Sequence, residues 1–253
     1  MPRLVIFLAP VILASCAATP EPRLRVEPGQ ILRYDCTHVT KSEYVGPGRQ
    51  TGSSKQAFPY HLSLTVKAVS DGGAQLTGTA LDADKMPTGE TFDWAIDEQG
   101  RWLKTRGLRH RVLGYCFGEE NLDGSADRTW RVRWLSLLDL APVGEFAEGG
   151  RRELELLFMG AQAKVVVDWY VESADEAGWT LMSTGEVAGW RDPVNETTLV
   201  SDRVSGRARI SARDGLPEKI ELRVEVQLAD EYGDVATSGT LDVTLERVQS
   251  NRI

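Results

Sequence analysis

The chain has 253 residues and a formal net charge of −8, with 37 acidic side chains against 29 lysines and arginines. This acidic balance argues against a nucleic-acid partner and against a polybasic contact with anionic lipid headgroups. The length suffices for one large β domain, or for two smaller ones, with a core that needs neither a metal nor a dense set of disulfides. No cofactor is predicted.

Residues 1–15 have the three parts of an export signal. Arg3 supplies a positive charge, residues 4–13 form an apolar run, and the small residues Ala14 and Ser15 precede Cys16. A transmembrane helix needs about 20 apolar residues, so this run is too short to remain as a membrane span. We therefore interpret residues 1–15 as a signal peptide that is removed.

The sequence Leu13-Ala14-Ser15-Cys16 resembles the lipobox of bacterial lipoproteins. This resemblance implies diacylglycerol on the thiol of Cys16, cleavage before Cys16, and acylation of the new amino group. Several acyl chains anchor a protein durably, whereas one chain does not. In this family, an aspartate directly after the lipidated cysteine resembles a signal for retention in the inner membrane. This chain has Ala17 at that position instead, which favours the outer membrane and its periplasmic face. An ordinary secretory signal is the alternative.

A short tether, residues 16–29, follows the signal and contains Pro20, Pro22 and Pro28. Prolines favour an extended chain, and the residues from Cys16 to Pro28 reach at most about 40 Å. The globular domain, residues 30–253, is therefore expected close to the bilayer.

Cys36 and Cys116 are the cysteines that remain besides Cys16. Disulfides persist outside the cytoplasm, so we predict a bridge between them, which would close a loop of about 80 residues. Two separately buried thiols are the alternative.

From Gln30 onward, apolar and polar residues alternate with period two between turns rich in Gly, Asp and Asn, as is typical of half-buried antiparallel strands. Five residues of the segment 60–68 are expected on one face: Tyr60, Leu62, Leu64, Val66 and Ala68. Further strands are expected over residues 74–81, 92–96, 102–105, 164–172, 179–187, 204–212, 219–228 and 241–248.

Residues 126–140 interrupt this pattern, because Trp130, Trp134 and Leu138 recur at helical spacing before Pro142. They predict a core-packing helix that plugs a curved sheet or joins two lobes. The predicted fold is mainly β: an antiparallel curved sheet or open half barrel with one interrupting α-helix. Similar glycine turns in residues 30–125 and 126–253 leave two similar β lobes as an alternative.

The sequence contains no HExxH, CxxC, GxSxG or phosphate-binding glycine motif. Cys36 and His38 lie two residues apart and would share a strand face, like a nucleophile and its base or two metal ligands. A disulfide on Cys36 would prevent either role. The acids Glu119, Glu120 and Asp123 are interpreted as solvated loop residues. We therefore predict no catalytic residue and no metal ligand.

Seven tryptophans are spread through the chain, and an aromatic strand face could bind an acyl chain, a carbohydrate or a peptide. The order of signal, tether and strands is similar to that of uncharacterised β-rich envelope lipoproteins. The expected architecture also resembles that of lipoprotein-localisation factors, in which a curved sheet carries acyl chains. We predict a non-enzymatic, lipid-anchored protein that binds a hydrophobic ligand or an envelope protein. An envelope hydrolase with paired carboxylates and a structural subunit of an envelope assembly are the alternatives.

Overall fold

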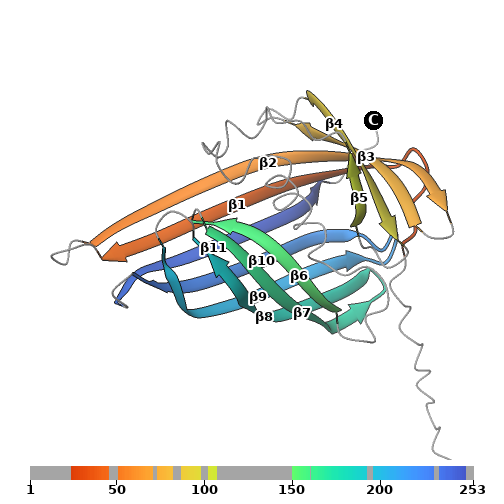
Figure 1. Ribbon diagram of the computed structural model, residues 1–253. Helices are drawn as coiled ribbons and strands as arrows, with labels where there is room; N and C mark the ends of the chain where they lie inside the picture. The colour runs from red at the N-terminus through yellow and green to blue at the C-terminus, as the bar shows by residue number, and fades with distance from the viewer. Residues whose placement is uncertain are drawn as a thin grey trace, which may run out of the picture.

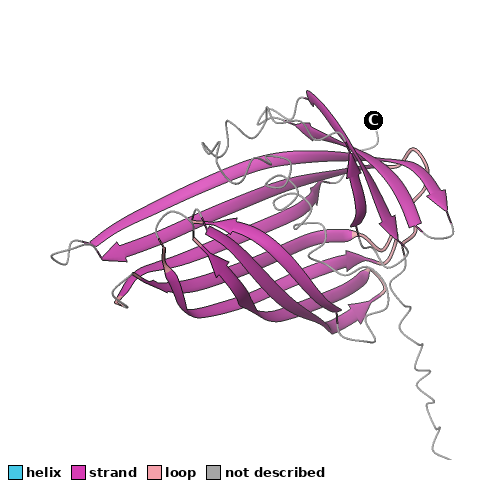
Figure 2. Ribbon diagram, in the orientation of Figure 1, coloured by secondary structure: helices cyan, strands magenta, loops and turns pink. Residues whose placement is uncertain are grey.

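In the part of the chain that the structure describes, eleven β-strands form one antiparallel sheet (Figures 1 and 2). The computed structural model describes residues 24–45, 51–70, 73–81, 87–97, 102–106, 150–159, 161–192, 196–230 and 234–248. The strands are β1 (Ile31–Val45), β2 (Thr51–Ser70), β3 (Gly73–Leu81), β4 (Pro87–Asp97), β5 (Trp102–Arg106), β6 (Gly150–Phe158), β7 (Ala161–Asp175), β8 (Gly178–Arg191), β9 (Thr198–Ser211), β10 (Pro217–Ala229) and β11 (Val235–Val248). These residues contain no helix, and the helix predicted over 126–140 lies outside them.

The strand order is β5-β4-β3-β2-β1-β11-β10-β9-β8-β7-β6. Strands that follow one another in the chain pair in the sheet, except β5 and β6, which form its two edges. At the centre of the sheet, the first strand pairs with the last. There the register runs from Arg33 opposite Val248 to Tyr44 opposite Thr237. The two parts of the chain considered as separate lobes therefore form the two sides of one curved, open sheet (Figure 1).

The period-two alternation sorts side chains onto two faces. In β10, Ile220, Leu222 and Val224 are buried, whereas Glu221 and Arg223 are exposed. Directly opposed residues of antiparallel strands share a face, so the apolar side chains of neighbouring strands join. Most buried apolar side chains of β1 to β4 and of β7 to β11 belong to one cluster. We call the face that carries this cluster the inner face, and the opposite one the outer face.

The structure confirms the strands whose ranges were predicted from alternation, and adds β1 and β6, for which no range was predicted. Leu62, Leu64 and Val66 are buried as expected. The prediction for Ala68 was wrong, because this residue is exposed. A β-bulge between Val66 and Ala68 inserts Lys67 into the ladder and reverses the side-chain direction beyond it.

The turn between β7 and β8 depends on an aspartate and a glycine. Asp175 Oδ1 accepts hydrogen bonds from the backbone N–H groups of Ala177 and Gly178, each at 2.9 Å, and from the guanidinium of Arg209 at 2.5 Å. Arg209 and these amides hold the pKa of Asp175 below its usual range. Gly178 has a φ of 150°, and a Cβ there would lie 1.9 Å from the carbonyl oxygen of Ile210. The turn therefore requires glycine.

The segment before β1 docks on the turn between β9 and β10. Arg25 N donates to the carbonyl oxygen of Asp214 at 2.9 Å, and Gln30 Nε2 donates to its carboxylate at 3.4 Å. Two guanidinium nitrogens of Arg247 donate hydrogen bonds to the same carboxylate, at 2.5 and 3.2 Å. The side chains of Asp214 and Arg247 are only 4% and 15% exposed. The chain therefore enters the fold at the end of the sheet that carries this turn.

Asp214→Asn is expected to lower the free energy of unfolding by about 3 kcal/mol or more, because it leaves the charge of Arg247 buried without its partner. Chemical denaturation monitored by circular dichroism measures this change. The matched control is Glu172→Gln, which breaks the exposed ion pair with Arg207 and should change stability by at most about 0.5 kcal/mol. Equal effects of the two substitutions would contradict the proposed role of the buried pair.

Candidate functional site

The inner face is the largest apolar surface of the described sheet. It continues without interruption from β3 through β1 and β11 to β7, and its side chains are buried. A sheet normally buries such a face against a second layer of helices or strands. Within the described ranges, neither a helix nor a second sheet packs on it. Its side chains are buried all the same, so an apolar ligand would bind here by displacing the atoms packed against them, and we take this face as the candidate site.

A row of opposed residues crosses the inner face at its middle. Trp169 on β7 lies opposite Ser183 on β8, which lies opposite Gly206 on β9, and Leu222 on β10 follows. A Cβ on Gly206 would lie 2.7 Å from Ser183 Oγ and 3.2 Å from Cη2 of Trp169. The absence of a side chain at Gly206 therefore lets the indole and the hydroxyl lie close to the sheet.

Three polar side chains on this apolar face each have a buried atom that lacks a hydrogen-bond partner. Trp169 Nε1, Ser183 Oγ and Arg152 Nε are buried and have no hydrogen-bond partner in the part of the chain that the structure describes. Arg152 lies opposite Val167, a member of the buried cluster, and therefore shares its face. We call Arg152, Trp169 and Ser183 the inner polar cluster. Such atoms are rare in folded proteins and require an explanation.

Cys36 and His38 lie on one strand face, as predicted, and both are buried on the inner face. His38 Nε2 is 3.4 Å from the hydroxyl of Thr40. Burial, with a smaller contribution from the charge of Asp35, raises the pKa of the Cys36 thiol. A protonated thiol is a poor nucleophile, so the raised pKa disfavours a nucleophilic role for Cys36.

The disulfide predicted between Cys36 and Cys116 receives no support from the structure. Cys36 is a free thiol, and Cys116 lies outside the described residues, as do Cys16 and the acidic loop residues 119–123. The lipid anchor and the interpretation of that loop therefore stay predictions. Among the described residues, no three His, Cys, Asp or Glu side chains are placed to hold a metal ion. The described segments also include no helix with the length and apolar character of a membrane span.

Sequence reasoning pointed to the tryptophans, and Trp169 and Trp179 are buried. It missed Ser183 and Arg152. Ser183 continues an inward-facing series with Trp179 and Leu181 in β8, so its position in the alternation was the available signal. Arg152 gave no comparable signal, because its face depends on the register of β6 against β7.

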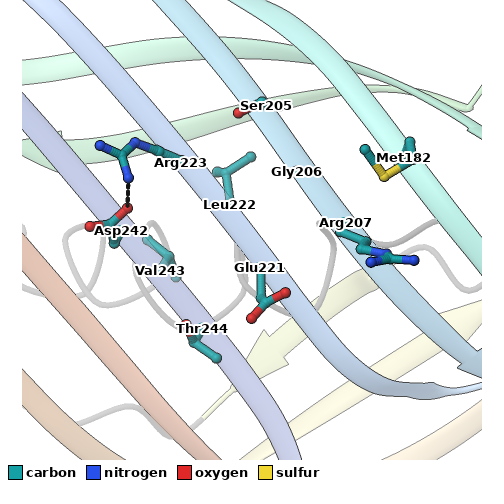
Figure 3. Close-up of a pocket in the computed structure, with 10 residues that line it drawn as sticks. All are labelled: Met182, Ser205, Gly206, Arg207, Glu221, Leu222, Arg223, Asp242, Val243 and Thr244. Carbon is teal, nitrogen blue, oxygen red and sulfur yellow. Dashed lines mark ion pairs between the residues drawn. The ribbon is translucent and has the colours of Figure 1, made fainter.

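A shallow depression of about 390 Å³ lies on the outer face over β8 to β11 (Figure 3). Its charged side chains are paired with neighbours. Asp242 binds Arg223 at 3.6 Å and Lys41 at 3.3 Å, Arg207 binds Glu172 at 3.1 Å, and Glu221 binds Lys219 at 2.7 Å. The two charges of each ion pair neutralise each other, so the depression is a weaker candidate for a ligand site than the inner face.

No known protein-family model matches the sequence, and no curated protein does. Among solved structures, the chain is similar to lipovitellin, in a structure that concerns its lipid–protein interactions. The identity is 12%, the alignment covers 88% of this chain and 25% of that one, and the TM-score is 0.52. This chain thus spans a quarter of the lipovitellin chain that it matches. The likeness is one of fold.

A conserved protein of unknown function with a hot dog fold, from Alicyclobacillus acidocaldarius, is 11% identical over 87% of this chain and 80% of its own. Its TM-score is 0.14, and it supports no inference.

Gly206→Ala is expected to lower the free energy of unfolding by about 1 to 3 kcal/mol, because the added methyl group meets Ser183 Oγ, the carbonyl oxygen of Glu221 and the ring of Trp169. Denaturant titration followed by tryptophan fluorescence measures the change. The matched control is Gly189→Ala in β8, where a Cβ meets only Lys164 Cβ at 3.4 Å. This control should leave stability unchanged or raise it by up to about 1 kcal/mol. A Gly206→Ala variant as stable as the control would show that the indole does not need this space.

Proposed function

We propose that the mature chain is a lipid-anchored lipoprotein of the bacterial envelope that binds a hydrophobic ligand, an acyl lipid, on the inner face of its sheet. The observation that carries this proposal is the continuous apolar face of an eleven-stranded sheet with no described second layer against it. Burial of hydrocarbon against such a face contributes about 25 cal/mol for each Å² removed from water. A single acyl chain would therefore supply enough apolar area for stable binding.

The likeness to lipovitellin supports a lipid as the ligand. That structure concerns the lipid–protein interactions of lipovitellin, and 88% of this chain aligns with a quarter of the lipovitellin chain. At 12% identity no individual residue can be carried over. The likeness therefore adds weight to the ligand class, and the residues that bind must come from this chain.

We propose a binding role rather than a catalytic one. The buried thiol of Cys36 has a raised pKa, which disfavours the thiolate that a nucleophile requires. The imidazole of His61 lies on the outer face, with Nδ1 2.6 Å from Asp35 Oδ1. It is therefore separated from Cys36 by the sheet itself.

The anchor predicted at Cys16 would orient the sheet on the membrane. Leu24 is the first described residue, and Arg25 is bonded to the turn between β9 and β10. About eight residues separate Cys16 from Leu24, which span at most about 28 Å. We therefore propose that this end of the sheet faces the outer membrane, from the periplasmic side.

Cys16→Ala is expected to abolish incorporation of labelled palmitate and to release the protein from the membrane fraction, because the anchoring acyl chains are attached through this residue. Labelling of cells followed by sucrose-gradient fractionation measures both effects, and Cys36→Ala serves as the matched control that should retain label and location. Incorporation of label into the Cys16→Ala variant would refute the anchor.

A chain that begins at Ala17 behind a cleavable export signal should copurify with about one acyl lipid per molecule, because the inner face offers it an apolar surface out of water. Mass spectrometry of an organic extract measures the lipid, against a mock purification from cells without the chain. An extract identical to the mock would contradict tight lipid binding and leave the anchor untouched.

A further inference from the structure

We infer that the inner polar cluster receives the carboxylate head of the bound acyl lipid, so that the ligand is a long-chain carboxylic acid in its ionised form. This inference rests on the proposed function and makes it specific. It assigns a head-group site to Arg152, Trp169 and Ser183.

The three residues come from three neighbouring strands. Arg152 on β6 lies opposite Val167 on β7, and Trp169, two residues further along β7, lies opposite Ser183 on β8. Neighbouring strands are about 4.8 Å apart and residues rise about 3.3 Å along a strand, so the side chains originate within about 12 Å of one another. They therefore form one polar patch on a face whose other side chains are mostly apolar.

Burial shows that these groups are withdrawn from water. Trp169 and Ser183 are each 2% exposed, and Trp169 Nε1 and Ser183 Oγ have no partner among the described residues. Buried polar groups are nearly always hydrogen-bonded, since an unmade bond costs the full desolvation of the group. Trp169 Nε1, Ser183 Oγ and Arg152 Nε are thus donors whose hydrogen bonds an external acceptor would complete once it displaces the atoms packed against them.

The chemistry of the three groups selects the acceptor. An indole N–H and a guanidinium N–H can only donate, and a serine hydroxyl can donate. Arg152 also brings a positive charge. A carboxylate offers two acceptor oxygens with about four lone-pair sites and one negative charge, which matches three donors and one cation. A neutral ester offers a weaker acceptor and no charge, so it should bind less well.

The inner face supplies the rest of the ligand site. Beyond the cluster, the row continues from Gly206 to Leu222 and Val243, so a hydrocarbon tail would lie along apolar side chains. The outer depression lacks this combination, because its charges are neutralised within pairs. The head group is therefore assigned to the inner face.

The test compares oleate, methyl oleate and acetate as probes, bound to the full mature chain carrying Cys16→Ala. Displacement of a fluorescent fatty ester measures the affinity of each probe. The chain with its inner-face residues unchanged should bind oleate at least about tenfold more tightly than methyl oleate. A hydrogen bond to a charged group contributes about a tenfold gain in affinity. Acetate should not compete at comparable concentrations, because it lacks the tail.

Three substitutions test the assignment: Ser183→Ala, Trp169→Phe and Arg152→Met. Each should reduce the preference for oleate over methyl oleate by roughly threefold to tenfold, while the affinity for methyl oleate changes less than about twofold. Ser183→Ala should not destabilise the fold, because it removes a buried group without a partner. Trp179→Phe is the matched control, since it shortens another buried indole of β8 outside the cluster and should leave the preference unchanged.

The outcomes separate this inference from the proposed function. Equal affinities for oleate and methyl oleate would overturn the carboxylate assignment while lipid binding stands. A preference that survives all three substitutions would also overturn it, because the head group would then lie elsewhere. Binding of neither probe would refute the proposed function and this inference with it.

Discussion

The pairing of the first strand with the last holds this molecule together as one sheet. The ladder between β1 and β11 joins the five strands on one side to the six on the other. It also places Tyr34 opposite Arg247, whose guanidinium binds Asp214 and so fixes the segment that leads into β1. Without this ladder the apolar face would be split into two smaller ones. The continuous inner face, on which the proposed function depends, is therefore a consequence of this central pairing.

The two faces of the sheet follow different physical rules. On the outer face, charged side chains form exposed pairs, such as Lys164 with Glu153 at 2.7 Å, which contribute little to stability and keep the surface soluble. On the inner face, close packing extends over most strands, and the few polar groups stand out because low polarity makes each unmade bond costly. The buried polar atoms without a hydrogen-bond partner among the described residues therefore belong to one cluster, Arg152, Trp169 and Ser183.

The alternation of residue types was enough to predict most strands, because a half-buried strand must place apolar side chains at every second position. It also put Cys36 and His38 on one face. It could not predict the union of β1 with β11, whose partners lie about two hundred residues apart, nor the bulge that exposes Ala68. β6 was not predicted, because its arginines and glutamates lower the strand propensity of the segment. Such charged residues are typical of a protected sheet edge. The inner polar cluster depends on register between three strands, which local patterns do not encode.

The central claim is that an acyl chain lies on the inner face, and photocrosslinking tests it most directly. A palmitate analogue with a diazirine near the end of its chain would be bound to the mature protein, activated by light, and its attachment sites mapped by peptide mass spectrometry. The account predicts labels on inner-face residues of β10 and β11 that do not line the outer depression, such as Val224 and Leu241. Labels confined to outer-face residues such as Met182 and Thr244, or no saturable labelling, would contradict it.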